Sequence, residues 1–279
     1  MIQRKKGICI QDILLLKEND ALEFMALKQM TPSKSKMFST IRAHYREMGF
    51  RKFLSRVIKI SFRIAKNQLY NFYHRCFYWK RFSLAGKNYF YFKHSYNTTW
   101  KNERIIEVPI MRKFIKNFQG KRILEVGNVL KKYYPFLKHD VIDKYEEVLG
   151  VINEDAANFS PKKKYDLIFS ISTIEHIGWD EVPKEPEKLF KLFDNLIKNC
   201  LAEKGILVFT APVGYNSFLD EYLKLEKLPI SKKLAMKRIS ENNLWIEIDY
   251  ELVKDVKFNT PFPNANAIIV GILEAEHRL

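Results

Sequence analysis

The strongest constraint on the fold is a series of short apolar runs that alternate with helical stretches in the C-terminal half of the chain. Each run has the length of a buried strand, and the stretch Pro186–Asn199 carries its apolar residues on one helical face. This alternation predicts an α/β domain whose mostly parallel sheet is covered by helices on both faces. The expected strands are Arg122–Val126, His139–Ile142, Gly150–Ile152, Tyr165–Ile171, Gly205–Ala211, Leu244–Ile248 and Ala267–Leu273.

Polar and small residues directly follow each of the first five expected strands. In a parallel sheet, ligands bind at the carboxyl ends of the strands, beside the switch in strand order. We therefore expect these residues to meet at one edge of the sheet and to form a ligand site. In chain order they are Glu125, Gly127 and Asn128; Asp143; Asp155 and Ala156; Ser172, Glu175 and His176; and Pro212–Gly214.

The order and spacing of these residues resemble the class I methyltransferases that use S-adenosylmethionine. The resemblance implies a Rossmann-like methyltransferase domain and S-adenosylmethionine as its cofactor. It covers about 100 residues, and several fragments in register make it more specific than any one of them. The fragments are Leu124–Gly127, Asp143, Asp155-Ala156 with Phe159, Tyr165–Ile168, Thr173–Ile177 and Leu201–Leu207.

The resemblance also implies a role for each residue. Asp143 would bind the ribose, because a carboxylate can accept hydrogen bonds from both hydroxyls of a diol. Asp155 would meet the adenine amino group. His176 is the expected general base, since its unperturbed pKa of about 6.5 suits proton transfer near neutral pH, and Glu175 is the second catalytic candidate. The remaining expected cofactor-binding residues are Glu125, Gly127, Asn128, Ala156 and Ser172.

Structural roles compete with these assignments. Glu125 can brace the turn that follows it, and Asp155 can act as the N-cap of a helix. His176 and Glu175 can shape the pocket without taking part in proton transfer. The adjacent pair has no further ligands at metal-site spacing, so no metal is expected.

The chain departs from the family pattern in the loop after the first strand, where only Gly127 remains of the usual glycines. Asn128 could replace one glycine, because asparagine tolerates left-handed backbone angles, whereas Val129 could not. A different loop path, with Tyr133 or Tyr134 covering the cofactor, is one outcome. A non-catalytic relative that has lost the cofactor is the other.

A second feature is the strongly basic segment before this domain. Between Ile41 and Phe82 there are eleven Lys or Arg residues and one acidic residue, and the whole chain carries a net charge of +16. On a helical wheel, the basic residues between Lys52 and Lys66 fall opposite a wide apolar face, and an aromatic run follows. This pattern favours a helix in an anionic membrane interface. A helix packed on the domain and a nucleic-acid-binding arm are the alternatives.

The composition predicts three zones and no disulfide framework. The zones are an N-terminal segment (1–36), the basic helical extension (37–100) and the methyltransferase domain (101–279). Cys9, Cys76 and Cys200 are far apart and form no CxxC pair. No apolar run is long enough to span a membrane, so we expect a cytoplasmic protein. Its basic segment could attach it to the membrane surface as a peripheral protein.

The sequence therefore predicts a methyltransferase that methylates an oxygen of a saccharide or another small polar acceptor at the membrane surface. The fragment after the fourth strand lacks the Asn/Asp-Pro-Pro-aromatic signature of nucleobase N-methylation. The alternatives are an RNA methyltransferase with a basic arm and a non-catalytic methyltransferase-like scaffold. Residues 215–243, which include Phe218, Tyr222, Met236 and Lys237, are expected to form a lid over the acceptor.

Overall fold

The structure, a computed structural model, describes residues 80–274 and ten residues between 55 and 73. The chain divides into two compact units, one of residues 1–68 with 134–138 and one of residues 69–133 with 139–279. The predicted N-terminal segment 1–36 and most of the basic segment lie outside the described residues. The ten described residues of that segment are helical, and Ile58, Phe62 and Leu69 are exposed. No helix among the described residues is long and apolar enough to cross a membrane.

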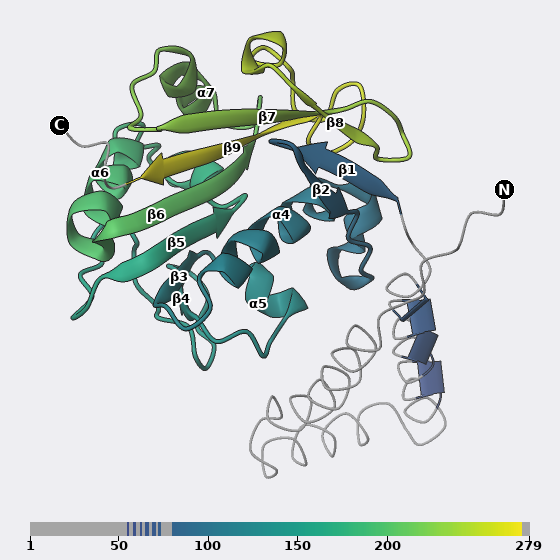
Figure 1. Ribbon diagram of the computed structural model, residues 1–279, viewed down its shortest axis with the longest axis horizontal. Coiled ribbons are helices and arrows are strands. Elements are labelled where there is room, and N and C mark those ends of the chain that lie inside the picture. Colours follow the sequence, from purple (N-terminus) through teal and green to yellow (C-terminus); the bar gives the residue numbers. More distant parts are fainter. Residues whose placement is uncertain are drawn as a thin grey trace, which may run out of the picture. The chain divides into compact units, whose positions relative to one another are not determined.

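The larger unit is built on a seven-stranded sheet with the order β4-β3-β5-β6-β9-β7-β8 (Figure 1). The pairs β3–β4, β3–β5 and β5–β6 are parallel, whereas β6–β9, β9–β7 and β7–β8 are antiparallel. Five strands therefore run in one direction, and β9 and β8 run in the other. The strands are β3 Ile123–Val126, β4 Asp140–Ile142, β5 Tyr165–Ile171, β6 Leu201–Pro212, β7 Lys232–Arg238, β8 Trp245–Ile248 and β9 Ala267–Glu274.

Most of the predicted strands occur at or within about two residues of their expected positions, and the mostly parallel α/β fold is confirmed. The expected strand Gly150–Ile152 is reduced to one parallel bridge between Ile152 and Ile142. The strand expected at Gly205 begins earlier, at Leu201. Of the seven strands of this sheet, β7 alone was not predicted.

Helices cover both faces of the sheet. Leu189, Leu192 and Phe193 of α6 (Lys188–Asn195) belong to one core cluster with Leu124 and Ile168, and the π-helix η3 (Leu196–Cys200) continues α6. Because neighbouring residues of a strand point to opposite faces of a sheet, β5 also has buried residues on its second face. On the other face, buried residues of β5 lie beside the 14-residue helix α4 (Arg104–Asn117), as Figure 1 shows.

A β-hairpin precedes α4 and belongs to the same unit as the sheet. Its strands β1 (Arg81–Leu84) and β2 (Lys87–Phe90) are joined at Ala85 and Gly86, both with positive φ, which suits a two-residue hairpin turn. The backbone N–H of Trp245 in β8 donates to the hydroxyl of Tyr91 at 2.7 Å. Residues 81–100, assigned to the extension by sequence, thus belong to the same unit as the sheet, and β1 lies beside β8. Alternate apolar residues of the hairpin (Phe82, Leu84, Tyr89 and Tyr91) are buried.

The structure also corrects the lid expected at residues 215–243. The segment contains the helix α7 (Ser217–Lys224) and the strand β7, which lies between β9 and β8. Met236 is fully buried in the sheet, so it cannot line a cover over an acceptor. The strand β7 was not predicted because lysines flank its short apolar core. Only the start of the segment, up to α7, stays near the carboxyl ends of the parallel strands.

Close packing between β6 and β9 requires a glycine at position 271. Gly271 pairs with Phe209 across the two strands, and both residues lie in the sheet's core. A Cβ atom at Gly271 would approach the Cε1 atom of Phe209 to 2.3 Å, so the aromatic ring fills the space that a side chain would need.

Gly271→Ala is expected to lower the free energy of unfolding by about 1–3 kcal/mol, because the ring of Phe209 must move in a tightly packed core. Urea unfolding of the chain measures this cost. In a Phe209→Leu background the added methyl group has more room, so the same change should cost less. Equal costs in both backgrounds would show that the ring is not the obstacle.

Candidate functional site

The predicted site residues are brought together at the carboxyl ends of the parallel strands. From β3 the chain passes to β4 on one side, and later to β5 on the other, so the strand order reverses at β3. Such a reversal opens a crevice at the carboxyl ends of the two strands, where ligands bind in open α/β sheets. The segments after β3, β4, β5 and β6 therefore form the candidate site.

Gly127 makes the turn out of β3. Its φ is +85°, and its N–H donates to the carbonyl of Ile142 at 2.8 Å. A Cβ atom here would lie 2.2 Å from Oγ1 of Thr173, so the loop after β5 presses directly on this glycine. Both the left-handed backbone and the close approach exclude any other residue.

Asn128 does not replace a second glycine in the way expected from sequence. Of the loop residues from Gly127 to Val129, only Gly127 has a positive φ. The loop needs no other glycine because it turns immediately into the short helix α5 (Leu130–Tyr133). Asn128 is nevertheless buried, and its Oδ1 atom has no hydrogen-bond partner among the described residues.

Glu125 holds this loop in place through hydrogen bonds to its backbone. Its fully buried Oε1 accepts the backbone N–H groups of Val129 at 2.9 Å and of Leu130 at 2.5 Å. Its Oε2 lies 2.7 Å from Nε2 of His139, which is also fully buried. The carboxylate thus binds the donors at the start of α5, a bracing role for which its charge is well suited.

Asp143 ties the ends of β3 and β4 together. Its Oδ1 accepts the N–H groups of Tyr145 at 2.9 Å and of Glu146 at 3.0 Å. Its Oδ2 accepts the N–H of Asn128 at 3.3 Å. A carboxylate oxygen has two lone-pair sites, so Oδ2 keeps the capacity for a further donor.

Asp155 is engaged in an ion-pair network. Its Oδ2 lies 2.8 Å from Nζ of Lys188 and 3.2 Å from Nζ of Lys144, and both lysines also bind Glu181. Burial raises the pKa of Asp155, but hydrogen bonds from the lysines and from the N–H of Ala157 outweigh it and lower the pKa. The buried Ala156 presents its carbonyl to Asn195.

The structure surrounds His176 with two partners that the sequence analysis missed. Nδ1 of the half-exposed His176 lies 2.5 Å from Oδ2 of Asp180, and the hydroxyl of Tyr215 donates to the same oxygen at 3.0 Å. Burial, with the neighbouring carboxylate of Asp180, raises the pKa of Tyr215 to about 12. The signal for Asp180 was its position four residues after the histidine, and that for Tyr215 was its place just after β6.

Glu175, the residue before His176, is buried beside a cluster of charged residues. The cluster contains Glu103, Arg104 and Glu107 from the start of α4. Oε2 of Glu175 has no hydrogen-bond partner among the described residues, and its Oε1 lies 3.8 Å from Nε2 of His176. Burial raises the pKa of Glu175 well above its usual range, although nearby Arg104 opposes the rise.

Ser172 closes this cluster on the side of β5. Its hydroxyl donates to Oε1 of Glu107 at 2.5 Å, so the side chain predicted to touch the cofactor is bound within the protein. The cluster, the glycine turn and the His176 triad all lie at the same edge of the sheet. Among the described residues, no group of histidine, cysteine and carboxylate side chains could hold a metal ion.

Aromatic rings lie around the His176 triad. The ring of Tyr215 packs edge-on against Phe258 at 5.1 Å between centroids, and Trp179 packs edge-on against Phe218 at 5.3 Å. Nζ of Lys184 lies 3.2 Å from the centroid of the Trp179 ring. These rings are partly exposed and offer flat apolar surfaces beside the histidine.

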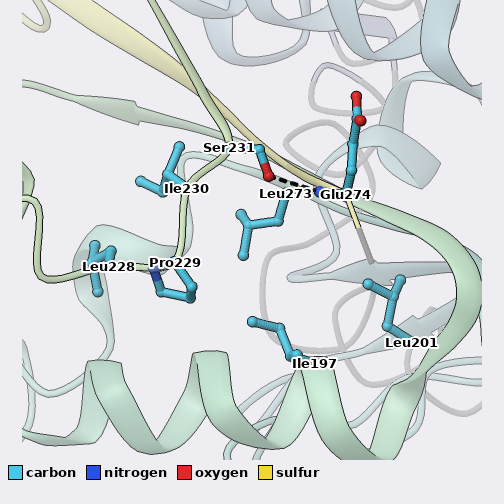
Figure 2. Close-up of a pocket in the computed structure, with 8 residues that line it drawn as sticks. All are labelled: Ile197, Leu201, Leu228, Pro229, Ile230, Ser231, Leu273 and Glu274. Carbon is cyan, nitrogen blue, oxygen red and sulfur yellow. Dashed lines mark hydrogen bonds between the residues drawn. The ribbon is translucent and has the colours of Figure 1, made fainter. Parts of the chain in front are cut away.

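A separate pocket of about 250 Å³ lies at the opposite end of the sheet (Figure 2). It is bounded by Leu201, the first residue of β6, and by Glu274, the last residue of the antiparallel β9. Six of its eight lining residues are apolar, and the hydroxyl of Ser231 accepts the N–H of Glu274 at 3.1 Å. It is distant from the strand ends that carry the site residues.

Tyr133, one of the two tyrosines considered as a cover for the cofactor, belongs to an aromatic cluster. It is buried, and its ring packs edge-on against Phe92, His94 and Tyr96 at centroid distances of 5.4, 5.4 and 5.2 Å. The segment before α4 therefore packs against the helix that follows the glycine turn.

Comparison with known proteins finds similarity only to solved structures. No family model and no curated protein matches the sequence. A SAM-dependent methyltransferase from Archaeoglobus fulgidus is 18% identical, with a TM-score of 0.41, over 64% of this chain and 97% of that one. The N-methyltransferase NodS from Bradyrhizobium japonicum, in complex with S-adenosyl-L-homocysteine, is 13% identical, with a TM-score of 0.36, over 62% and 90%. Because these values are low, the functional assignment depends on this chain's own strand order and site residues.

Glu175→Gln is expected to leave the thermal midpoint at neutral pH unchanged or higher, because burial raises the pKa of this carboxyl and so favours the neutral form that glutamine resembles. Since the folded pKa lies above the unfolded one, the stability that this group contributes is present at low pH and is lost as pH rises through the folded pKa. The variant should therefore lose less stability than the unaltered chain towards alkaline pH, as measured by calorimetry.

The exposed Glu221 provides a matched control. Glu221→Gln should leave the pH dependence of the midpoint as it is. A large fall of the midpoint at neutral pH in Glu175→Gln alone would mean that Glu175 is ionised and paired, contrary to this prediction.

Proposed function

We propose that this protein is an S-adenosylmethionine-dependent methyltransferase. The observation that carries the proposal is the reversal of strand order at β3, with the Gly127 turn and Asp143 at the two adjoining strand ends. A crevice at such a point is where α/β sheets bind nucleoside cofactors. Three of the similar solved structures are described as methyltransferases, and two of these hold S-adenosyl-L-homocysteine.

The residues at this edge fit the cofactor in three respects. Gly127 lets the backbone turn without a side chain, and Oδ2 of Asp143 can accept from a ribose hydroxyl. The buried Oδ1 of Asn128 can accept a hydrogen bond from the ligand. Asp155 fits less simply, because Lys144 and Lys188 already occupy its carboxylate. When bound, the cofactor supplies an electrophilic methyl group on a sulfonium.

The His176 triad favours an acceptor that must lose a proton, such as a hydroxyl. Asp180 lies at Nδ1, so it holds the ring in the tautomer that leaves Nε2 free to take that proton. Tyr215 fixes the carboxylate of Asp180 from the other side. The residues therefore orient the acceptor oxygen and remove its proton, and proximity supplies much of the remaining rate.

We extend the proposal to an acceptor that is a saccharide or another small polar molecule at the membrane surface. The flat rings of Trp179, Tyr215 and Phe258 beside His176 suit the apolar face of a sugar. The basic segment 41–82, with Ile58 and Phe62 exposed among its described residues, suits an anionic leaflet.

Titration with S-adenosylmethionine by calorimetry tests the cofactor. We expect micromolar binding that Asp143→Ala weakens at least about tenfold, because the variant loses the ribose acceptor and the brace on Asn128. Asp194→Ala, which removes an exposed carboxylate on α6, should bind as the unaltered chain does. No binding by a folded sample at millimolar cofactor would refute the proposal and favour the non-catalytic scaffold.

Transfer of a labelled methyl group to a panel of acceptors tests the chemistry. With the accepted substrate, His176→Gln should lower kcat by about 100-fold or more while the Kd for the cofactor stays within about twofold. Asp180→Asn should lower kcat less and shift its pH profile, since the ring then loses its orienting carboxylate. The panel contains glycans, lipid-linked sugars and RNA; methylation of RNA alone would overturn the saccharide assignment.

A further inference from the structure

Ser172, the first residue after β5, has a strained backbone. Its φ is +35°, in the left-handed region that L-residues other than glycine rarely adopt. It is buried, and its neighbour Ile171 ends a strand in ordinary extended conformation. Such a conformation costs free energy and persists only where the surroundings hold it. The residues that hold it are therefore informative about function.

Three residues fix this serine. Its N–H donates to the carbonyl of Thr210 in β6 at 3.0 Å and to the hydroxyl oxygen of Thr210 at 3.3 Å, and its hydroxyl donates to Oε1 of Glu107 at 2.5 Å. Its carbonyl accepts from Nη2 of Arg104 at 3.4 Å. Two of these three residues thus belong to the first turn of α4.

The two α4 residues hold each other as well. Glu107 is fully buried, and its carboxylate forms an ion pair with the guanidinium of Arg104 one turn away. Its Oε2 faces the guanidinium while its Oε1 faces Ser172. A buried charge pair with fixed geometry is a rigid support for a strained turn.

The strained backbone at Ser172 also sets the position of the loop that contains Gly127. Thr173 follows Ser172, and its side chain occupies the space in which a Cβ of Gly127 would lie, with Oγ1 at 2.2 Å. A change in φ at Ser172 would swing Thr173 towards or away from Gly127. The backbone that should meet the cofactor therefore depends on α4 through Ser172 and Thr173.

We propose that Glu107 and Arg104 are positioning residues that hold the Ser172 turn in its left-handed conformation and thereby preorganise the Gly127 loop for the cofactor. This inference rests on the proposed function, because its readout is affinity for S-adenosylmethionine. It assigns a role in the site to a helix that precedes the sheet and that the sequence motifs do not include. Ser172 itself serves as the hinge on which these contacts act.

A matched pair of variants at Ser172 tests the inference. Ser172→Ala and Ser172→Gly both remove the hydroxyl, but only glycine adopts a positive φ without strain. We expect Ser172→Ala to raise the Kd for S-adenosylmethionine about tenfold, and Ser172→Gly to recover most of that loss. Equal affinities in the two variants, or normal affinity in Ser172→Ala, would overturn the inference.

A second pair tests Glu107 directly. Glu107→Gln should weaken cofactor binding by about tenfold, and the double variant Glu107→Gln with Ser172→Gly should regain part of it, because glycine no longer needs the support. A role in packing alone would lower the thermal midpoint without any rescue of affinity by glycine, and that result would overturn the inference. If the unaltered chain fails to bind the cofactor, the proposed function fails and the inference falls with it. If only the rescue fails, the inference alone is wrong.

Discussion

The contact between Gly127 and Thr173 is the constraint on which the rest of the site depends. It joins the loop after β3 to the loop after β5, the two strands at which the sheet reverses its order. Because no Cβ fits between them, the two loops lie as close as backbone and side chain allow. The distance across the crevice is therefore fixed by packing, and the polar groups on each side are held at a constant separation.

Buried carboxylates provide the support on both sides of this contact. Glu125 binds the N–H groups at the start of α5 and the ring of His139, and Glu107 binds Ser172 and Arg104. Each carboxylate lies within the protein and stabilises a loop whose exposed side faces the crevice. Asp143 completes the arrangement, since it holds the N–H of Asn128 and keeps one oxygen able to accept another donor.

Sequence reasoning found the residues that follow the strands but not the partners that give them their roles. Glu125 and Ser172 were expected to touch the cofactor, yet both side chains are bound within the protein. Asp180 and Tyr215, which orient His176, were not assigned to it, because Asp180 lies outside the family fragments and Tyr215 comes from another strand end. The strand β7 was missed because flanking lysines conceal its short buried core.

By itself, the sequence determined the α/β class, the parallel core strands and the edge of the sheet at which polar residues gather. These features follow from local patterns, because the length of an apolar run and the polar residue after it can be read from neighbouring residues of the sequence. Only the tertiary structure decided that one glycine suffices in the loop and that α4 supports the Ser172 turn. Such contacts join residues that are 46 to 65 positions apart (Gly127 to Thr173, and Glu107 to Ser172), and packing alone brings them together.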